Sequence, residues 1–269
     1  MAIKIQTTRN YGTDGVKILV YSPAGIGKTR LCETAPNPLI ISNEAGLLSL
    51  ADYDVAMVET STVKEIDDVY DMLTSDSKEA EYFETICLDS ITEIAEVMLI
   101  QYKQDYKDPR QAYGLLADDM GTLIRKFRDI KGKHVYFTAK QMRIQDDDGV
   151  TMRMPGMPGK TLLNGLSFFF DEVFVLRLGK LEDNTIYRYL QTFPDFSYDA
   201  KDRSGKMLPK AMPDLTNVFD IISGKVEAVQ ESELDEVVVD AKGEAEAEAK
   251  DDAATEGEEK EVEPEQDET

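Results

Sequence analysis

The residues best suited to chemistry in this chain form one short segment, Y-S-P-A-G-I-G-K-T, at positions 21–29. It follows an apolar run and precedes residues able to start a helix, which is the layout of a phosphate-binding loop. Gly25 and Gly27 let backbone N–H groups turn toward a phosphate. Lys28 can reach the β- and γ-phosphates, and the Thr29 hydroxyl can bind magnesium. The segment therefore predicts ATP and Mg²⁺ as ligands.

This segment departs from the usual pattern, G-x-x-x-x-G-K-[ST], at one position, because Ser22 stands where the first glycine is expected. The departure removes no group that contacts phosphate. A glycine- and proline-rich turn ending in Lys-Thr is the alternative, and the apolar strand in front of the segment argues against it. The residues expected to line the nucleotide are Ser22, Pro23, Ala24, Gly25, Ile26, Gly27, Lys28, Thr29 and Arg30.

Strands and helices alternate along the rest of the chain. Apolar runs predict strands at 16–21, 38–42, 83–89, 134–139, 172–178 and 185–192, and amphipathic spacing predicts helices at 63–73, 91–105 and 115–130. The last two strands are close enough to pair as a hairpin. This order predicts an α/β fold with a mostly parallel sheet and an antiparallel extension, in which ligands bind at the carboxyl ends of the strands.

Three polar residues follow predicted strands at that edge. The Asp89 carboxylate can hold the magnesium bound near Thr29, and it can also cap the helix that follows. Glu44 can polarise an attacking water or lie in a solvated turn. Gln141 can sense a γ-phosphate by hydrogen bonding.

Composition divides the chain into a folded part and an acidic tail. The chain has 269 residues, of which 42% are hydrophobic, enough for one sizeable domain. Residues 227–269 include 19 Asp and Glu but three Lys, which accounts for −16 of the net charge of −23. This segment has no aromatic residue and few large apolar ones. We therefore expect a folded domain at 1–226 and a disordered tail at 227–269.

The remaining global signals indicate a cytoplasmic protein. Cys32 and Cys87 fall in a predicted helix and a predicted strand, as expected of reduced core thiols, and no zinc spacing occurs. The first ten residues lack an apolar secretory segment. The most hydrophobic window, 162–178, is interrupted by Asp171 and Glu172 and is a poor membrane span.

Together these segments resemble the RecA-like P-loop NTPase core, over roughly residues 10–215. The resemblance implies that Glu44, in I-I-S-N-E-A-G-L, is the catalytic base and that C-L-D-S is the Walker B end with Asp89 as metal ligand. It implies that Gln141, in F-T-A-K-Q-M-R, senses the γ-phosphate, with Lys140 as a competing candidate. Lys28 completes the expected catalytic set within one subunit.

A second resemblance concerns Y-D-A-K-D-R-S-G-K at 198–206, which is similar to the K-x-R finger of hexameric DnaB-type helicases and RadA-like recombinases. It implies that Lys201 and Arg203 reach the γ-phosphate held by a neighbouring subunit. An ordinary polar turn is the alternative. With the finger, the protein would act as a homo-oligomer, either a ring or a filament.

RecA-like proteins place two mobile loops along their inner surface, and the resemblance implies DNA contacts at roughly 103–114 and 142–165. The first segment mixes basic and aromatic residues, and the second carries basic residues among glycines and methionines. Plain surface connections are the alternative, and the acidic run 146–148 argues against an evenly basic surface. The candidate DNA-binding residues are Lys103, Tyr106, Lys107, Arg110, Tyr113, Arg143, Arg153 and Lys160.

The compact size, K-D-P-R-Q-A-Y-G and A-K-D-R-S-G-K look most like the phage-encoded RecA-like ATPases of the Sak group. This resemblance implies an ATPase of the host cytoplasm that binds single-stranded DNA, oligomerises and promotes strand annealing or recombination. A single-strand-binding protein or another recombination protein would be its partner. A small DnaB-like helicase or translocase is one alternative, and a nucleotide-switched binding protein with little turnover is another. The tail would mimic DNA, recruit a partner or aid solubility.

Overall fold

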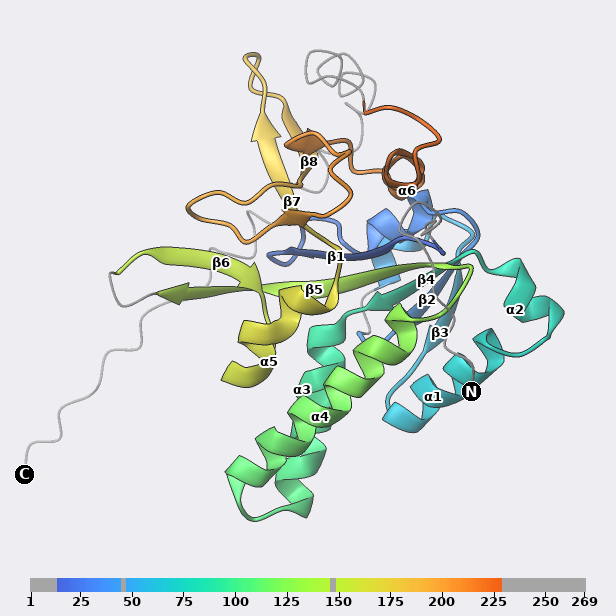
Figure 1. Ribbon diagram of the computed structural model, residues 1–269, viewed down its shortest axis with the longest axis vertical. Coiled ribbons are helices and arrows are strands. Elements are labelled where there is room, and N and C mark those ends of the chain that lie inside the picture. The colour runs from blue at the N-terminus through green and yellow to red at the C-terminus, as the bar shows by residue number, and fades with distance from the viewer. Residues whose placement is uncertain (1–13, 45–46, 146–148, 229–269) are drawn as a thin grey trace, which may run out of the picture.

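The computed structural model describes residues 14–44, 47–145 and 149–228 (Figure 1). One sheet runs through this part of the chain, in the order β10-β8-β7-β1-β5-β4-β2-β3, with β6 paired to β5 and β9 paired to β7. The strands are β1 (Lys17–Ser22), β2 (Pro38–Ser42), β3 (Ala56–Glu59), β4 (Thr85–Asp89), β5 (His134–Gln145), β6 (Thr151–Pro155), β7 (Glu172–Lys180), β8 (Ile186–Gln191), β9 (Lys201–Asp202) and β10 (Lys210–Ala211).

The helices connect and cover these strands. The α-helices are α1 (Val63–Leu73), α2 (Lys78–Tyr82), α3 (Ile91–Asp105), α4 (Pro109–Arg128), α5 (Lys160–Gly165) and α6 (Leu215–Ser223), and the 3-10 helices are η2 (Arg30–Thr34), η3 (Leu47–Leu50) and η4 (Leu166–Phe169). None of the helices in the described ranges is long and apolar enough to cross a membrane.

The central strands β7, β1, β5, β4, β2 and β3 are parallel to their neighbours, whereas β8 pairs antiparallel with β7 and β10 pairs antiparallel with β8. The predicted α/β class, with a mostly parallel sheet and an antiparallel hairpin, is confirmed. The parallel register brings the ends of β1, β2, β4 and the first half of β5 to one edge of the sheet. Loops from four separate parts of the sequence therefore meet there.

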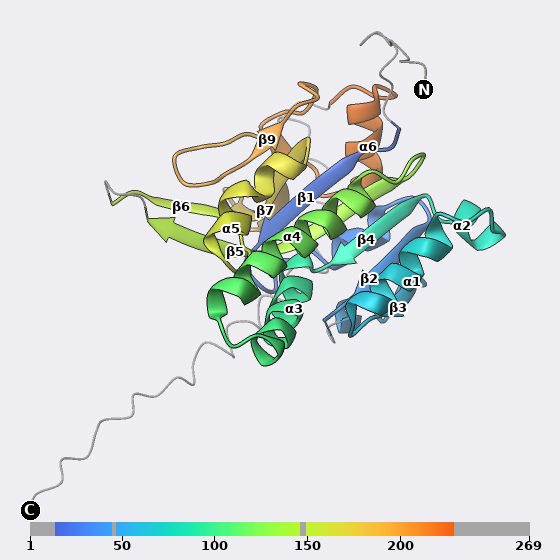
Figure 2. The same cartoon turned by 60° about the horizontal axis from the view of Figure 1, so that its bottom comes forward.

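The central strands β1, β4 and β2 are buried on both faces, as parallel strands usually are. On β1, Leu19 and Tyr21 join a core that includes α1, α3 and α4, whereas Ile18 and Val20 join a second core with η2 and α6. Figures 1 and 2 show these two helical layers on opposite sides of the sheet. The cysteines, Cys32 and Cys87, lie in the second core and are free thiols, as expected.

The expected helix after the glycine loop is present, but two other expectations about local structure were wrong. The helix after the glycine loop is the short 3-10 helix η2, because Ala35, which precedes Pro36, is extended (ψ 152°) and ends it. The expected loop at 103–114 is instead mostly helical. Asp108 caps α4 by accepting from the Arg110 amide, with a proline at the first helical position.

The expectation of a loop at 142–165 is also wrong, because this segment contains the end of β5, then β6 and α5. β5 continues past the parallel sheet and pairs with β6, joining Gln141 to Pro155 and Gln145 to Thr151 in register. In Figures 1 and 2 this hairpin projects away from the body of the sheet. The acidic run 146–148 lies outside the described residues, as does the predicted tail from residue 229 onward.

Candidate active site

The glycine loop follows β1 directly and turns at two glycines. Gly25 and Gly27 have φ angles of 75° and 100°, in the left-handed region that residues with a side chain rarely adopt. The chain then enters η2, in which the Leu31 amide donates to the Gly27 carbonyl oxygen at 3.2 Å. The loop therefore lies at the carboxyl edge of the parallel strands, with its backbone bent into a tight curve.

Lys28 folds back over this loop. Its Nζ donates to the Ser22 carbonyl oxygen at 3.2 Å, to Ser22 Oγ at 3.2 Å and to the Pro23 carbonyl oxygen at 3.0 Å. Burial lowers the pKa of the Lys28 ammonium, and the carboxylates of Asp89 and Glu44 oppose that shift. Ser22, which replaces the first glycine of the usual pattern, thus supplies two of these three acceptors.

Asp89 ends β4 and connects it to the loop. Its buried carboxylate accepts from Thr29 Oγ1 at 2.6 Å and from Thr138 Oγ1 of β5 at 2.5 Å. A hydroxyl and a carboxylate are hard oxygen ligands, and Mg²⁺ commonly takes one or two such groups together with phosphates and waters. Thr29 and Asp89 fit that ion, which would neutralise phosphate charge. The described residues contain no cluster of three His, Cys, Asp or Glu that could form an all-protein metal cage.

Glu44 lies beside the end of β4. Its Oε1 accepts from Ser90 Oγ at 2.7 Å, and Ser90 Oγ also accepts from the Glu93 amide at 3.3 Å to cap α3. Ser90 therefore caps the helix and orients the glutamate at the same time. The Glu44 charge also acts on the ammonium of Lys28. A carboxylate fixed in this way can accept a proton from a water molecule at the site.

Gln141 and Lys140 follow the parallel half of β5, where Lys140 pairs in register with Ser22. Burial lowers the pKa of Lys140, but hydrogen bonds from its Nζ to Glu93 at 2.6 Å and Glu96 at 2.8 Å raise it overall. Gln141 Oε1 is buried and has no hydrogen-bond partner within the described residues. An unpaired buried acceptor costs about 1–3 kcal/mol, so this oxygen would gain from a donor brought by a ligand.

The segment with Lys201 and Arg203 lies at the other edge of the sheet. Lys201 pairs with the residue after Glu172, and Glu172 pairs with Ile18 on β1. Ile18 lies four residues before Ser22, or roughly 13 Å along the strand. The structure therefore does not bring these two cations together with the glycine loop of the same chain.

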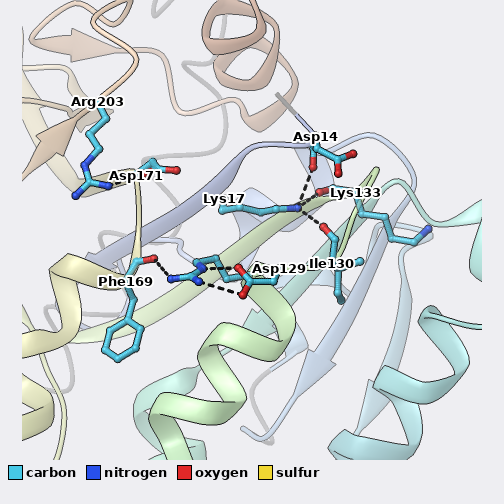
Figure 3. A network of polar contacts seen from close by, with 9 residues as sticks. Asp14, Lys17, Asp129, Ile130, Lys133, Phe169, Asp171 and Arg203 are labelled. Atoms are coloured by element: carbon cyan, nitrogen blue, oxygen red, sulfur yellow. Dashed lines mark hydrogen bonds and ion pairs between the residues drawn. The ribbon is translucent and has the colours of Figure 1, made fainter. Parts of the chain in front are cut away.

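Both cations have contacts within the chain. The Lys201 ammonium donates to the carbonyl oxygens of Ser167 and Phe170, and burial lowers its pKa. The Arg203 guanidinium forms an exposed ion pair with Asp171 at 2.7 Å. Figure 3 shows this pair, together with the contacts of Lys17 at the start of β1. Arg203 is the more exposed of the two cations.

The DNA-binding candidates form three groups. Lys103 Nζ lies 5.2 Å from the ring centre of Tyr113, and Tyr113 and Lys160 line one open pocket of about 450 Å³. Arg143 and Arg153 are paired in register across the β5–β6 hairpin. The other three candidates, Tyr106, Lys107 and Arg110, lie at the corner between α3 and α4.

Three side chains at the site were missed by sequence reasoning. Thr138 binds Asp89, the Tyr136 hydroxyl donates to the Lys28 carbonyl oxygen at 2.9 Å, and Arg188 Nε donates to the Ile26 carbonyl oxygen at 2.9 Å. A polar residue inside the apolar strand H-V-Y-F-T-A is a usable signal for Thr138. Arg188 lies 162 positions from Ile26 in the sequence, so no local pattern could reveal it.

Comparison with known proteins identifies a protein family that this chain matches. A family model described as an AAA domain matches residues 14–204, more than half of the chain. The chain is also similar to the crystal structure of a KaiC-like protein from the hyperthermophilic archaeon Pyrococcus horikoshii OT3, with 16% identity and a TM-score of 0.36 over 65% of this chain and 77% of that one. A search of the curated proteins finds no match.

Proposed function

The chain belongs to the AAA domain family of P-loop ATPases, and we propose that it couples ATP binding and hydrolysis to assembly on single-stranded DNA and to the pairing of complementary strands. The observation that carries the ATPase part is the hydrogen bond between Thr29 and Asp89, at 2.6 Å. It joins the glycine loop to the end of β4 and provides two hard oxygen ligands for magnesium beside Lys28.

In this proposal Glu44 is the general base and Gln141 the sensor of the γ-phosphate. Glu44 is held by Ser90 next to Asp89, at the edge where the glycine loop lies. The unpaired Oε1 of Gln141 supports the sensor role, because a donor at the site would satisfy it. Gln141 is also the first residue of β5 that pairs with β6. A movement of Gln141 on nucleotide binding would therefore be transmitted to that hairpin.

Arg203 would act on the nucleotide of a neighbouring subunit. Its place at the opposite edge of the sheet supports action between subunits, since it is far from the loop of its own chain. Its exposed ion pair with Asp171 would hinder this little, because such pairs are worth about 0–1 kcal/mol. In this proposal Lys201 fixes the position of β9, by donating to the carbonyl oxygens of Ser167 and Phe170.

Single-stranded DNA would bind along the projecting hairpin and the neighbouring pocket. Arg143 and Arg153 suit phosphate contacts, and the partly exposed ring of Tyr113, near Lys103 and Lys160, suits stacking on a base. These side chains can contact phosphates and stack on bases, but few of them can form hydrogen bonds that distinguish one base from another. Binding without strong sequence preference is therefore expected.

Three assays on one preparation test this function: ATP hydrolysis with and without single-stranded DNA, annealing of complementary oligonucleotides, and duplex unwinding. We expect hydrolysis that DNA stimulates, annealing that requires ATP, and no unwinding. Lys28→Ala, which removes the cation of the glycine loop, should abolish the ATP-dependent activities. Unwinding without annealing would favour a helicase, and DNA binding switched by ATP without turnover would favour a nucleotide-controlled binding protein.

A further inference from the structure

The hairpin of β7 and β8 contacts the glycine loop through one side chain. Arg188 pairs with Leu178 in the β7–β8 register, and its Nε donates to the Ile26 carbonyl oxygen at 2.9 Å. The contact is close, since a Cβ added at Gly27 would lie 3.3 Å from the same Nε. A strand far along the sequence therefore packs against the middle of the loop.

We propose that Arg188 is a positioning residue that orients the peptide between Ile26 and Gly27 for phosphate binding; this inference rests on the proposed nucleotide-binding function. A trans peptide is planar, with its C=O and N–H pointing in opposite directions. Arg188 of β8 holds the Ile26 oxygen toward the β7–β8 hairpin, so the Gly27 N–H points away from that hairpin, which in this proposal is the inner, phosphate-binding side of the loop. An inward N–H is what a phosphate-binding loop requires.

The carbonyl oxygens of Ile26 and Lys28 differ in the donors that hold them. The Lys28 carbonyl oxygen accepts from the Leu31 amide at 3.2 Å as well as from the Tyr136 hydroxyl. For the Ile26 oxygen, Arg188 is the donor that we find within the described part of the chain. Gly27, at φ 100°, lacks a side chain that could restrain this peptide. Arg188 therefore restrains a peptide that the Gly27 residue itself cannot restrain.

Acting through the loop backbone has a kinetic signature. The loop binds phosphates shared by ATP and ADP, so loss of Arg188 should weaken both nucleotides alike. KM for ATP should rise with little change in kcat. A residue that acts in the transition state, as proposed for Arg203, should instead lower kcat. Steady-state kinetics of ATP hydrolysis can therefore distinguish the role of Arg188 from that of Arg203.

The experiment compares three full-length variants with the wild type by calorimetric titration of Mg·ADP and by thermal melting. Arg188→Met keeps the apolar stem but loses the donor, Arg188→Lys keeps a cationic donor, and Lys180→Ala removes an exposed cation from the same hairpin. We expect Arg188→Met to bind ADP about 10-fold or more weakly, as for a lost hydrogen bond from a charged donor. Arg188→Lys should recover part of the loss, and Lys180→Ala should bind as the wild type does.

The outcomes are distinct. Wild-type affinity in a folded Arg188→Met protein would overturn the inference and leave the ATPase proposal intact. Failure of Arg188→Met to fold would also overturn it, because Arg188 would then support the fold rather than the peptide. An equal loss of affinity in Arg188→Lys and Arg188→Met would overturn it too, because the loss would not depend on a cationic donor at this position. No ADP binding by the wild type would overturn both the inference and the proposed function.

Discussion

At the scale of single residues, two glutamates show how surroundings decide the role of a carboxylate. Glu44 accepts a hydrogen bond from Ser90, and its charge acts on the ammonium of Lys28. Glu172 is buried beneath the segment with Arg203. Burial, followed by the charge of Asp202, raises its pKa to about 8.

Glu44→Gln should retain nucleotide binding and lose hydrolysis. The amide keeps the size of the side chain and an oxygen for the Ser90 hydroxyl, but it cannot take a proton from water. A decrease in kcat of about 100-fold or more, with ADP affinity within about twofold of wild type, is expected from steady-state kinetics and calorimetry. Turnover at the wild-type rate would place the base elsewhere.

Glu172→Gln should make stability less dependent on pH. In the folded protein Glu172 keeps its proton up to about pH 8, whereas in the unfolded chain it ionises at its ordinary, lower pKa. The folded state therefore binds more protons across this interval, and the stability of the wild type falls as pH rises through it. Glutamine cannot ionise and avoids this loss.

Melting curves at pH 5, 6.5 and 8 would test this expectation. The Tm of Glu172→Gln relative to wild type should increase with pH, by about 2–4 °C for each kcal/mol. Glu182→Gln, at an exposed position, is the control and should show no such trend. A Tm difference for Glu172→Gln that is constant with pH would mean that Glu172 is ionised in the folded protein.

At the scale of elements, β5 connects the two proposed sites. Its first half carries Thr138 against Asp89, and its second half forms the projecting hairpin. The start of α3 is attached to the same hairpin by Thr92. Its hydroxyl donates to the Gly156 carbonyl oxygen at 2.8 Å and accepts from the Lys140 amide at 3.0 Å. Movement at the end of β4 can thus reach the base of the hairpin through Thr92.

Thr92→Val should uncouple DNA from hydrolysis. Valine nearly matches threonine in volume but makes neither hydrogen bond, leaving two buried backbone groups unpaired. We expect ADP binding close to wild type and a several-fold loss of stimulation by single-stranded DNA. Thr122→Val on the exposed face of α4 is the control. Normal stimulation in a folded Thr92→Val protein would exclude this route.

At the scale of the whole molecule, the sheet separates the glycine loop from Arg203, so the role proposed for Arg203 requires a second copy of the chain. Two aromatic side chains are also strongly exposed: Phe168 at 78%, three residues before the Arg203 partner Asp171, and Phe196 at 94%, seven residues before Arg203. They lie in segments that contact each other, since Ser167 Oγ donates to Asp199. This surface suits contact with another subunit.

Mixing two inactive variants tests that arrangement. Arg203→Ala and Lys28→Ala should each hydrolyse ATP poorly alone, but their mixture should recover part of the activity. Recovery would come from interfaces that join an intact glycine loop to an intact Arg203. An arginine acting between subunits is typically worth about 1,000-fold or more in kcat, so few restored interfaces suffice for detection. No recovery in mixtures that co-assemble would leave Arg203 with a local structural role.

The sequence by itself determined the elements whose signals are local. The bounds of β2, α1 and α3 match those expected from apolar spacing, and the glycine loop, Glu44 and Asp89 follow strands at one edge as predicted. Each of these depends on residues within a turn or two of one another. Side-chain type and spacing were therefore enough to find them.

Only the tertiary structure decided how distant segments meet. It formed a β5–β6 hairpin where a loop was expected, because strand pairing outweighs loop-like composition. It placed Lys201 and Arg203 at the opposite edge from the loop, and it brought Arg188 to Ile26. These results depend on strand register and long-range packing, which no short segment encodes because both partners of each contact must be known.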